Sequence, residues 1–253
     1  MRGLKKPRPP TNVRPNGQTP QQFVDAEREY LAALGGRTNK TRFARTEFDQ
    51  LHKIKLRQVM YGEQGSICVY CERRLAEDLP PPHVDHWRPL RAVPEFAIHW
   101  NNLYLSCATR NTCDIRKGGQ PLKAEDTDPD LPWPTEFAYE CVVGFTSGGR
   151  MYVRSDVDLS DATRRALELA IDDVRHDGRR RNSILNLNHP SLVEARRASL
   201  DSERTRLERK SSKNAQSSDE RTVRTAQILG QDPRPEHVSI RVAWLLETLG
   251  RGL

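Results

Sequence analysis

The stretch of sequence that decides the fold reads CVYC at residues 68–71, VDH at 84–86, WNNL at 100–103 and CATRNTCDIRKG at 107–118. Two cysteine pairs enclose an acid, a histidine and two asparagines, with short apolar runs between them. Segments this short do not fold alone, and a bound metal ion commonly supplies the missing stability. The stretch therefore predicts a small hairpin-and-helix unit that is stapled by a metal.

The cysteines have the spacing of a metal site. Cys68 and Cys71 are separated by two residues, which lets both thiolates point at one tetrahedral ion, and Cys107 and Cys113 can complete the set. The second pair is wider than the common gap of about two to four residues, so its loop is expected to bulge. Zinc is favoured over disulfides where thiols stay reduced. Four protein ligands leave no position for water, so the zinc is predicted to be structural.

A second, chemically different group lies beside these ligands. Asp85 and His86 stand between the cysteine pairs, and Asp114 directly follows the last cysteine, which fixes its backbone. An imidazole with an ordinary pKa near ~6.5 accepts a proton at neutral pH, and carboxylate oxygens suit magnesium or manganese. A base that activates water and a cation that offsets charge are the parts needed to cleave a phosphodiester. We therefore predict a second, catalytic metal on Asp85 and Asp114.

The combined motifs resemble a known signature. The two cysteine pairs, the segment 84–89, the segment 100–103 and the final CDxxKG are similar to those of HNH endonucleases with the ββα-metal fold. The resemblance implies that His86 is the general base, that Asp85 is a metal ligand, and that Asn102 ties down the loop and orients His86. Asp114 stands where the family usually has asparagine or histidine. A carboxylate preserves the ligand role and leaves the choice of metal open.

The resemblance extends beyond the core motif. Residues 1–7, 65–74 and 184–188, together with Leu192 and the pair 196–197, are similar to the HNH subunit of Septu anti-phage systems and to related retron effectors. This similarity implies a nuclease that works beside an ATPase of the ABC or SMC-like type and defends a bacterium against phage.

The charge balance fits a polyanionic partner. The chain of 253 residues has a formal net charge of +7, and a sequence pI near 9.3. Such a balance is weak evidence on its own, because basic runs are usually solvated faces. Arg88, Arg116 and Lys117 flank the predicted centre and are candidates for holding phosphates, arginine through its fork and lysine as a point charge.

Membrane association is not expected. No apolar run approaches the length that spans a bilayer, and the basic, proline-rich start lacks the apolar core of a secretory signal. We therefore expect a cytoplasmic protein with reduced thiols and no membrane partner.

The fold class expected is α+β, with a small zinc-stapled ββα-metal HNH module embedded in a mostly helical chain. Four parts are predicted: an extended basic arm over 1–20, N-terminal helices over 21–64, the nuclease module over 65–120, and a hairpin and helical region over 121–253 that is suspected of docking a partner. Apolar spacing predicts helices over 23–34, 46–60, 161–174, 191–214, 222–229 and 238–249, and a hairpin within 137–153. Cys141 falls in that hairpin and is expected to be a buried apolar side chain.

Three functions remain to be distinguished. The first is a metal-dependent HNH endonuclease acting on DNA, and the second is the same enzyme acting on RNA. The third is a non-catalytic zinc module that binds nucleic acid or a partner, and it leaves the coincidence of Asp85, His86, Asn102 and Asp114 unexplained. No element that would read a base sequence stands out. The basic clusters do not fill this role, because they bind phosphates without reading bases.

Overall fold

The structure is a computed structural model, and it describes residues 6, 9–15, 18, 22–75, 80–119, 131–172, 184–211, 218–231 and 235–250. Most of the predicted N-terminal arm therefore lies outside the described residues. In the described ranges helices and short strands are mixed, which confirms the α+β expectation at that level. No helix in those ranges is long and apolar enough to cross a membrane.

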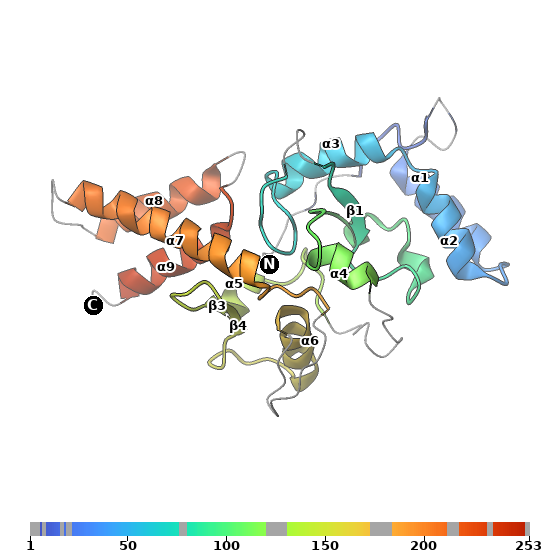
Figure 1. Cartoon of the computed structure of the whole chain (residues 1–253). Coiled ribbons are helices and arrows are strands. Elements are labelled where there is room, and N and C mark those ends of the chain that lie inside the picture. Colours follow the sequence, from blue (N-terminus) through green and yellow to red (C-terminus); the bar gives the residue numbers. More distant parts are fainter. Residues whose placement is uncertain are drawn as a thin grey trace.

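Three helices open the described chain, α1 (Phe23–Leu34), α2 (Lys40–Asp49) and α3 (Lys53–Gln64), and they lie along one side of the molecule (Figure 1). The helix predicted over 23–34 forms with those bounds. The single helix predicted over 46–60 is wrong, because the chain breaks between α2 and α3. The amide of His52 leaves the helical pattern and donates to the carbonyl of Val13 at 2.7 Å. This long-range bond is invisible in the local apolar spacing.

The described part of the arm packs against the folded chain. Val13 is fully buried. Arg14 donates to Gln50 at 2.9 Å and pairs with Glu47 at 3.0 Å. The ammonium group of Lys6 lies 3.9 Å from the ring centroid of Trp100. These contacts fasten the arm to α2 and to the middle of the chain.

Two strands and a helix form the middle of the molecule. Strand β1 (His83–His86) pairs antiparallel with β2 (Leu103–Ser106), and Asp85 lies opposite Tyr104 in the register. Two short 3-10 turns, η2 (Pro94–Phe96) and η3 (Trp100–Asn102), lie in the connection between the strands. Helix α4 (Cys113–Gly119) follows β2. All four residues of β2 are buried, so this strand forms part of the main core.

The predicted hairpin is confirmed as β3 (Val143–Phe145) and β4 (Met151–Val153), preceded by the single turn of α5 (Tyr139–Val142). Gly149 in its turn has a φ of 88°, and a Cβ atom there would lie 2.4 Å from the carbonyl oxygen of Val193. The position therefore requires glycine. Cys141 is exposed, so the expectation that it is buried is wrong. It lies on the outer side of the α5 turn, whose buried residues are Tyr139 and Val142.

Helices dominate the described residues after β4, as predicted. They are α6 (Asp161–Ile171), α7 (Pro190–Ser211), α8 (Ser218–Gly230) and α9 (Val238–Gly250). In Figure 1 α7, α8 and α9 lie together on the side of the molecule away from α1 and α2. Buried Glu203 of α7 joins the three helices, because it accepts from Arg224 of α8 and Arg241 of α9. A second small core unites them with Ile67, which directly precedes the first cysteine pair.

Candidate functional site

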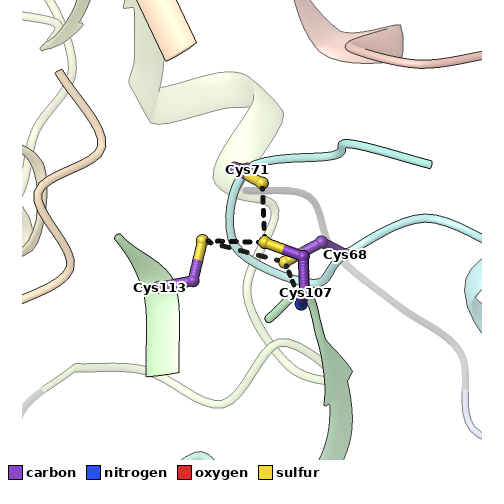
Figure 2. Close-up of side chains that lie close together, drawn as sticks. All are labelled: Cys68, Cys71, Cys107 and Cys113. Carbon is purple, nitrogen blue, oxygen red and sulfur yellow. Dashed lines mark hydrogen bonds between the residues drawn. The ribbon is translucent and has the colours of Figure 1, made fainter. Parts of the chain in front are cut away.

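Four cysteine sulfurs point toward one another at the junction of the middle unit and the C-terminal part (Figure 2). Cys68 and Cys71 lie in a turn, Cys107 follows β2, and Cys113 begins α4. The sulfur of Cys113 lies 3.9 Å from that of Cys68 and 3.7 Å from that of Cys107, which is itself 3.7 Å from that of Cys71. A tetrahedral zinc with bonds of about 2.3 Å separates its sulfurs by about 3.8 Å. All four side chains are buried and none forms a disulfide, so the cluster can bind a metal ion.

The wide second pair forms the bulge that its spacing predicts. Asn111 and Cys113 both have left-handed backbones, with φ of 62° and 54°. The segment 184–188 closes this loop: the carbonyl of Leu185 accepts from the amide of Cys113 at 2.9 Å, and the side chain of Asn186 donates to the carbonyl of Asn111 at 2.9 Å. A segment distant in sequence thus fixes the second pair of ligands.

The first pair is held by residues just before and within α9. The carboxylate of Glu72, which directly follows Cys71, accepts from the amide and the hydroxyl of Ser239. His237 donates from Nδ1 to the carbonyl of Cys71 at 2.9 Å, and its amide donates to the carbonyl of Glu72 at 3.0 Å. Glu72 is buried, yet the hydrogen bonds from Ser239 help to lower its pKa against the effect of burial. Both cysteine pairs therefore depend on the C-terminal part.

A buried cation accompanies the cysteine cluster. Arg196 of α7 is 2% exposed and donates to the carbonyl of Leu187 at 2.5 Å. Burial lowers the pKa of Arg196 to about 10, and the charges of Cys71, Glu72 and Cys113 oppose that shift. The guanidinium therefore stays charged at neutral pH. Its Nε and Nη1 atoms have no hydrogen-bond partner in the described part of the chain.

Helix α4 also packs its charged side chains against β1. Nδ1 of His83 lies 2.6 Å from Oδ2 of Asp114, and the hydroxyl of Ser106 donates to Oδ1 of Asp114 at 2.8 Å. One turn later Lys117 pairs with Asp85, which stands two residues after His83 and on the same side of the strand. Burial, and then the charge of Asp85, raise the pKa of Asp114. The two carboxylates predicted to share a metal thus lie close enough to repel each other.

Lys117 donates entirely to protein atoms. Its ammonium group contacts Oδ2 of Asp85, the hydroxyl of Tyr70 at 2.8 Å and the carbonyl of His86 at 2.5 Å. The hydroxyl of Tyr70 also donates to Asp85 at 2.6 Å. Three acceptors match the three donors of an ammonium group. In this arrangement Lys117 is the internal counter-charge of Asp85.

The imidazole of His86 is held in one orientation. Its Nε2 lies 2.8 Å from the carbonyl oxygen of Ala97, and its ring packs on the ring of Phe48 with centroids 4.3 Å apart. A carbonyl only accepts, so Nε2 carries the proton and Nδ1 carries the lone pair. Burial lowers the pKa of His86 to about 4. The ring is therefore neutral at neutral pH and can accept a proton at Nδ1.

Asn102 braces the loop that holds this histidine. Its Oδ1 accepts from the amide of Arg88 at 2.7 Å, while its Nδ2 donates to the carbonyls of Arg88 at 3.1 Å and Phe96 at 2.9 Å. The side chain is fully buried. Asn102 thus joins the chain after β1 to the turn that carries Ala97, whose carbonyl orients His86.

A cavity of about 780 Å³ opens beside this group. It brings together Asp85, His86 and Lys117 of the predicted site, whereas Asp114, Arg88 and Arg116 are not among its lining residues. Its other walls come from α2 with its cap and from the loop after β1, namely Asn39, Thr41, Arg42, Arg45, Thr46, Pro89, Leu90 and Arg91. Sequence reasoning missed the arginines of α2 because a basic helical face does not show which element it will meet.

Metal-binding geometry is otherwise limited. Across the described ranges, the four cysteines are the one group of three or more metal-ligating side chains whose ligand atoms come together. Asp85 and Asp114 are neighbours, but each is engaged by a basic partner, Lys117 and His83 respectively. Asp85 of β1 and Asp114 of α4 therefore lie near each other, and no third metal-ligating side chain joins them within the described ranges.

A mixed α and β fold with a four-cysteine site beside an acid and histidine cleft invites comparison with known proteins. No family model matches the chain. It is 38% identical over 58 residues to the Septu protein PtuB of Bacillus thuringiensis, which is 23% of this chain and 21% of that protein. It is 31% identical over 94 residues to a candidate HNH endonuclease of retron Vc95 from Vibrio cholerae serotype O1 biovar El Tor, which is 34% of this chain and 44% of that protein.

These relatives confirm the predicted resemblance to HNH-like nucleases of defence systems. The chain spans less than half the length of either relative.

Proposed function

We propose that this protein is a metal-dependent HNH endonuclease that hydrolyses phosphodiester bonds in DNA. The observation that carries the proposal is the geometry of His86, whose ring is neutral, is fixed at Nε2 by the carbonyl of Ala97 and lines the cavity beside Asp85. The order β1, β2, α4, with Asp85 on the first strand and Asp114 on the helix, supports a ββα-metal module.

In this proposal the cysteine cluster holds a structural zinc. The sulfur separations fit tetrahedral coordination, and the amide of Cys107 donates to the sulfur of Cys68 at 3.4 Å, which suits a thiolate. The zinc has no open position and takes no part in the reaction. A bound zinc would fix the start of α4, whose Lys117 lines the cleft and whose Asp114 hydrogen-bonds to His83 and Ser106 beside it. Reduced cysteines also support a cytoplasmic location.

A catalytic magnesium or manganese ion is assigned to Asp85 and Asp114. Hard carboxylate oxygens suit either ion. Burial and the charge of Asp85 raise the pKa of Asp114. A cation between the two carboxylates would offset their repulsion. When bound, the ion supplies charge compensation at the phosphorane and at the leaving oxygen. Lys117 and Tyr70 hold Asp85 in place, and His83 and Ser106 hold Asp114.

His86 is the proposed general base. Its Nδ1 removes a proton from the water that attacks phosphorus, and the bond from Nε2 to Ala97 spreads and anchors the resulting positive charge. Asn102 keeps the carbonyl of Ala97 in position, because it is hydrogen-bonded to Arg88 at one end of the loop and to Phe96 at the other. The low pKa of the free imidazole means that the base is available throughout the neutral range.

The biological setting is proposed from the relatives. Similarity to PtuB and to a retron HNH protein supports a nuclease of Septu-type or retron-type defence. An ABC or SMC-like ATPase is the partner that we propose for it, from the resemblance of the sequence motifs. Helices α7 to α9 form a distinct group with exposed charged residues, and we assign partner docking to them. RNA remains the alternative substrate, because a site that reads phosphates accepts either backbone.

Cleavage assays with the purified chain test the proposal. Plasmid DNA and single-stranded RNA are incubated with the protein in EDTA, magnesium or manganese, with and without a candidate ATPase. We expect metal-dependent cutting of DNA. His86→Ala should reduce the rate by at least about a hundredfold, since general base catalysis contributes that much or more. His52→Ala is the matched control, because His52 lies outside the cavity lining.

Two results would count against parts of the proposal. Cutting confined to RNA would replace DNA as the substrate and keep the mechanism. Equal cutting by the wild type and His86→Ala would reject the assigned base.

A further inference from the structure

We propose that α2 is the phosphate-gripping wall of the cleft, with Arg42 and Arg45 contacting the backbone of the nucleic-acid strand presented to His86. This inference rests on the proposed nuclease function and adds the element that holds the substrate. Helix α2 lies well before the cysteine and histidine motifs in the sequence, so the motifs themselves do not indicate such a role.

Packing places α2 directly beside the proposed base. The helix buries Ala44 and Phe48 on one side, and the ring of Phe48 meets the ring of His86 with centroids 4.3 Å apart. Arg45 precedes Phe48 by three residues and Arg42 precedes Arg45 by three, so these positions follow one another along the helix. Both arginines line the same cavity of about 780 Å³ as Asp85 and His86.

The charges on this wall are available to a ligand. Arg42 and Arg45 are exposed, and in the part of the chain that the structure describes no carboxylate forms an ion pair with either guanidinium. Arg14 and Arg28, by contrast, form ion pairs, with Glu47 and Asp25 respectively.

The chemistry of the wall fits a phosphodiester backbone. A guanidinium group offers a planar fork of donors that matches two phosphate oxygens. The first turn of α2 contains no acidic residue, and Thr41 adds a hydroxyl group to the same lining. Such contacts fix the strand beside His86 without reading bases. The wall therefore provides affinity and position, and sequence choice must come from elsewhere.

Binding measured without cleavage separates this inference from the catalytic proposal. A fluorescein-labelled DNA duplex is titrated with the zinc-loaded protein without added magnesium or manganese, and anisotropy gives the affinity over a range of salt concentrations. The test variant is Arg42→Ala with Arg45→Ala. The control is Lys55→Ala with Arg206→Ala, which removes the same net charge from exposed positions outside the cavity lining.

Each phosphate contact contributes about 0.9 to the slope of log affinity against log salt. The test variant should lower that slope by about two and weaken binding about tenfold or more, while the control stays near the wild type. Arg42→Lys with Arg45→Lys should retain the slope, because the charges remain. Circular dichroism and metal content check that each variant is folded.

Two results would contradict phosphate binding by Arg42 and Arg45. Equal slopes for test and control variants would do so, as would a wild-type chain that does not bind the duplex at all. If the test variant has a reduced salt slope but the wild type never cleaves, phosphate binding by α2 is supported and the catalytic proposal is rejected. If the test variant binds normally and the wild type shows metal-dependent cleavage, phosphate binding by α2 is rejected and the catalytic proposal is supported.

Discussion

Lys117 lies at the centre of the candidate cleft, where its ammonium group meets Asp85, Tyr70 and the carbonyl of His86. Its side chain is 9% exposed and that of Asp85 is 14% exposed, so solvent screens this pair weakly. Removing the ammonium would leave a nearly buried carboxylate with Tyr70 as its remaining donor among the contacts described. The pair therefore supports both the fold and the position of Asp85.

Lys117→Met should destabilise the protein by about 2–4 kcal/mol, because it breaks a buried ion pair and keeps most of the side-chain volume. Urea unfolding measures the loss. Magnesium should recover part of it, since a cation at Asp85 replaces the missing charge. Arg150→Met is the control: Arg150 pairs with Asp172, but its side chain is 51% exposed, and its loss should cost less than about 1 kcal/mol. Equal losses for the two variants would contradict the buried role.

The four-cysteine cluster was predictable from sequence, but the partner of Lys117 was not. The spacing of Cys68, Cys71, Cys107 and Cys113 predicted one cluster, and the structure gathers these four sulfurs. Residue type alone made Lys117 a candidate phosphate ligand, whereas the fold sets it against Asp85. An ammonium group suits either partner, so the choice depends on the packing of α4 on β1.

At the scale of elements, segments far from the cysteines in sequence hold the cysteine cluster in place. The segment 184–188 closes the second pair, and residues before and within α9 hold the first. Helix α7 adds the buried guanidinium of Arg196. A four-thiolate zinc carries a net negative charge of about two, so a nearby buried cation stabilises it.

Arg196→Met should weaken zinc binding by about tenfold or more, because groups that support the ligands of a metal commonly contribute that much to its affinity. Competition with a chromogenic chelator measures the change. The neighbouring Arg197→Met is the control, since Arg197 is 67% exposed and its partner Asp201 lies on the same helix. An unchanged affinity in a folded Arg196→Met protein would show that the guanidinium does not stabilise the cluster.

Helix prediction failed where tertiary contacts decide the backbone. The apolar stripe of residues 46–60 has one helical period, yet α2 ends at Asp49 and α3 begins at Lys53. Leu51 is buried in the break, and the neighbouring amide of His52 bonds to Val13 of the arm. Apolar periodicity records which residues face the core, and it does not record such a bond across the chain. Helix α1 has no break of this kind and was predicted with its observed bounds.

At the scale of the whole molecule, the cysteine cluster joins the middle unit to the C-terminal helices. Ile67, next to the first cysteine pair, shares a small core with α7, α8 and α9. Loss of the metal should therefore loosen both parts. Zinc binding by small modules supplies about 10–16 kcal/mol, which rivals the whole stability of a domain.

Cys113→Ser should abolish zinc binding and the cooperative unfolding transition, and limited proteolysis should then cut the middle and C-terminal parts alike. Zinc analysis and thermal melting provide the measurements. Cys141→Ser is the matched control, because Cys141 is exposed and stands outside the cluster. A stable Cys113→Ser protein without zinc would show that the cluster is dispensable for folding.

The most direct test of the central claim compares the wild type with His86→Ala when both are folded and loaded with zinc. Zinc content, thermal melting and plasmid cleavage are measured on the same preparations, with magnesium or manganese added or withheld. We expect equal zinc content and similar folding in the two proteins, with metal-dependent cutting by the wild type and almost none by the variant. Undiminished cutting by His86→Ala, or cutting that needs no added divalent ion, would contradict this expectation.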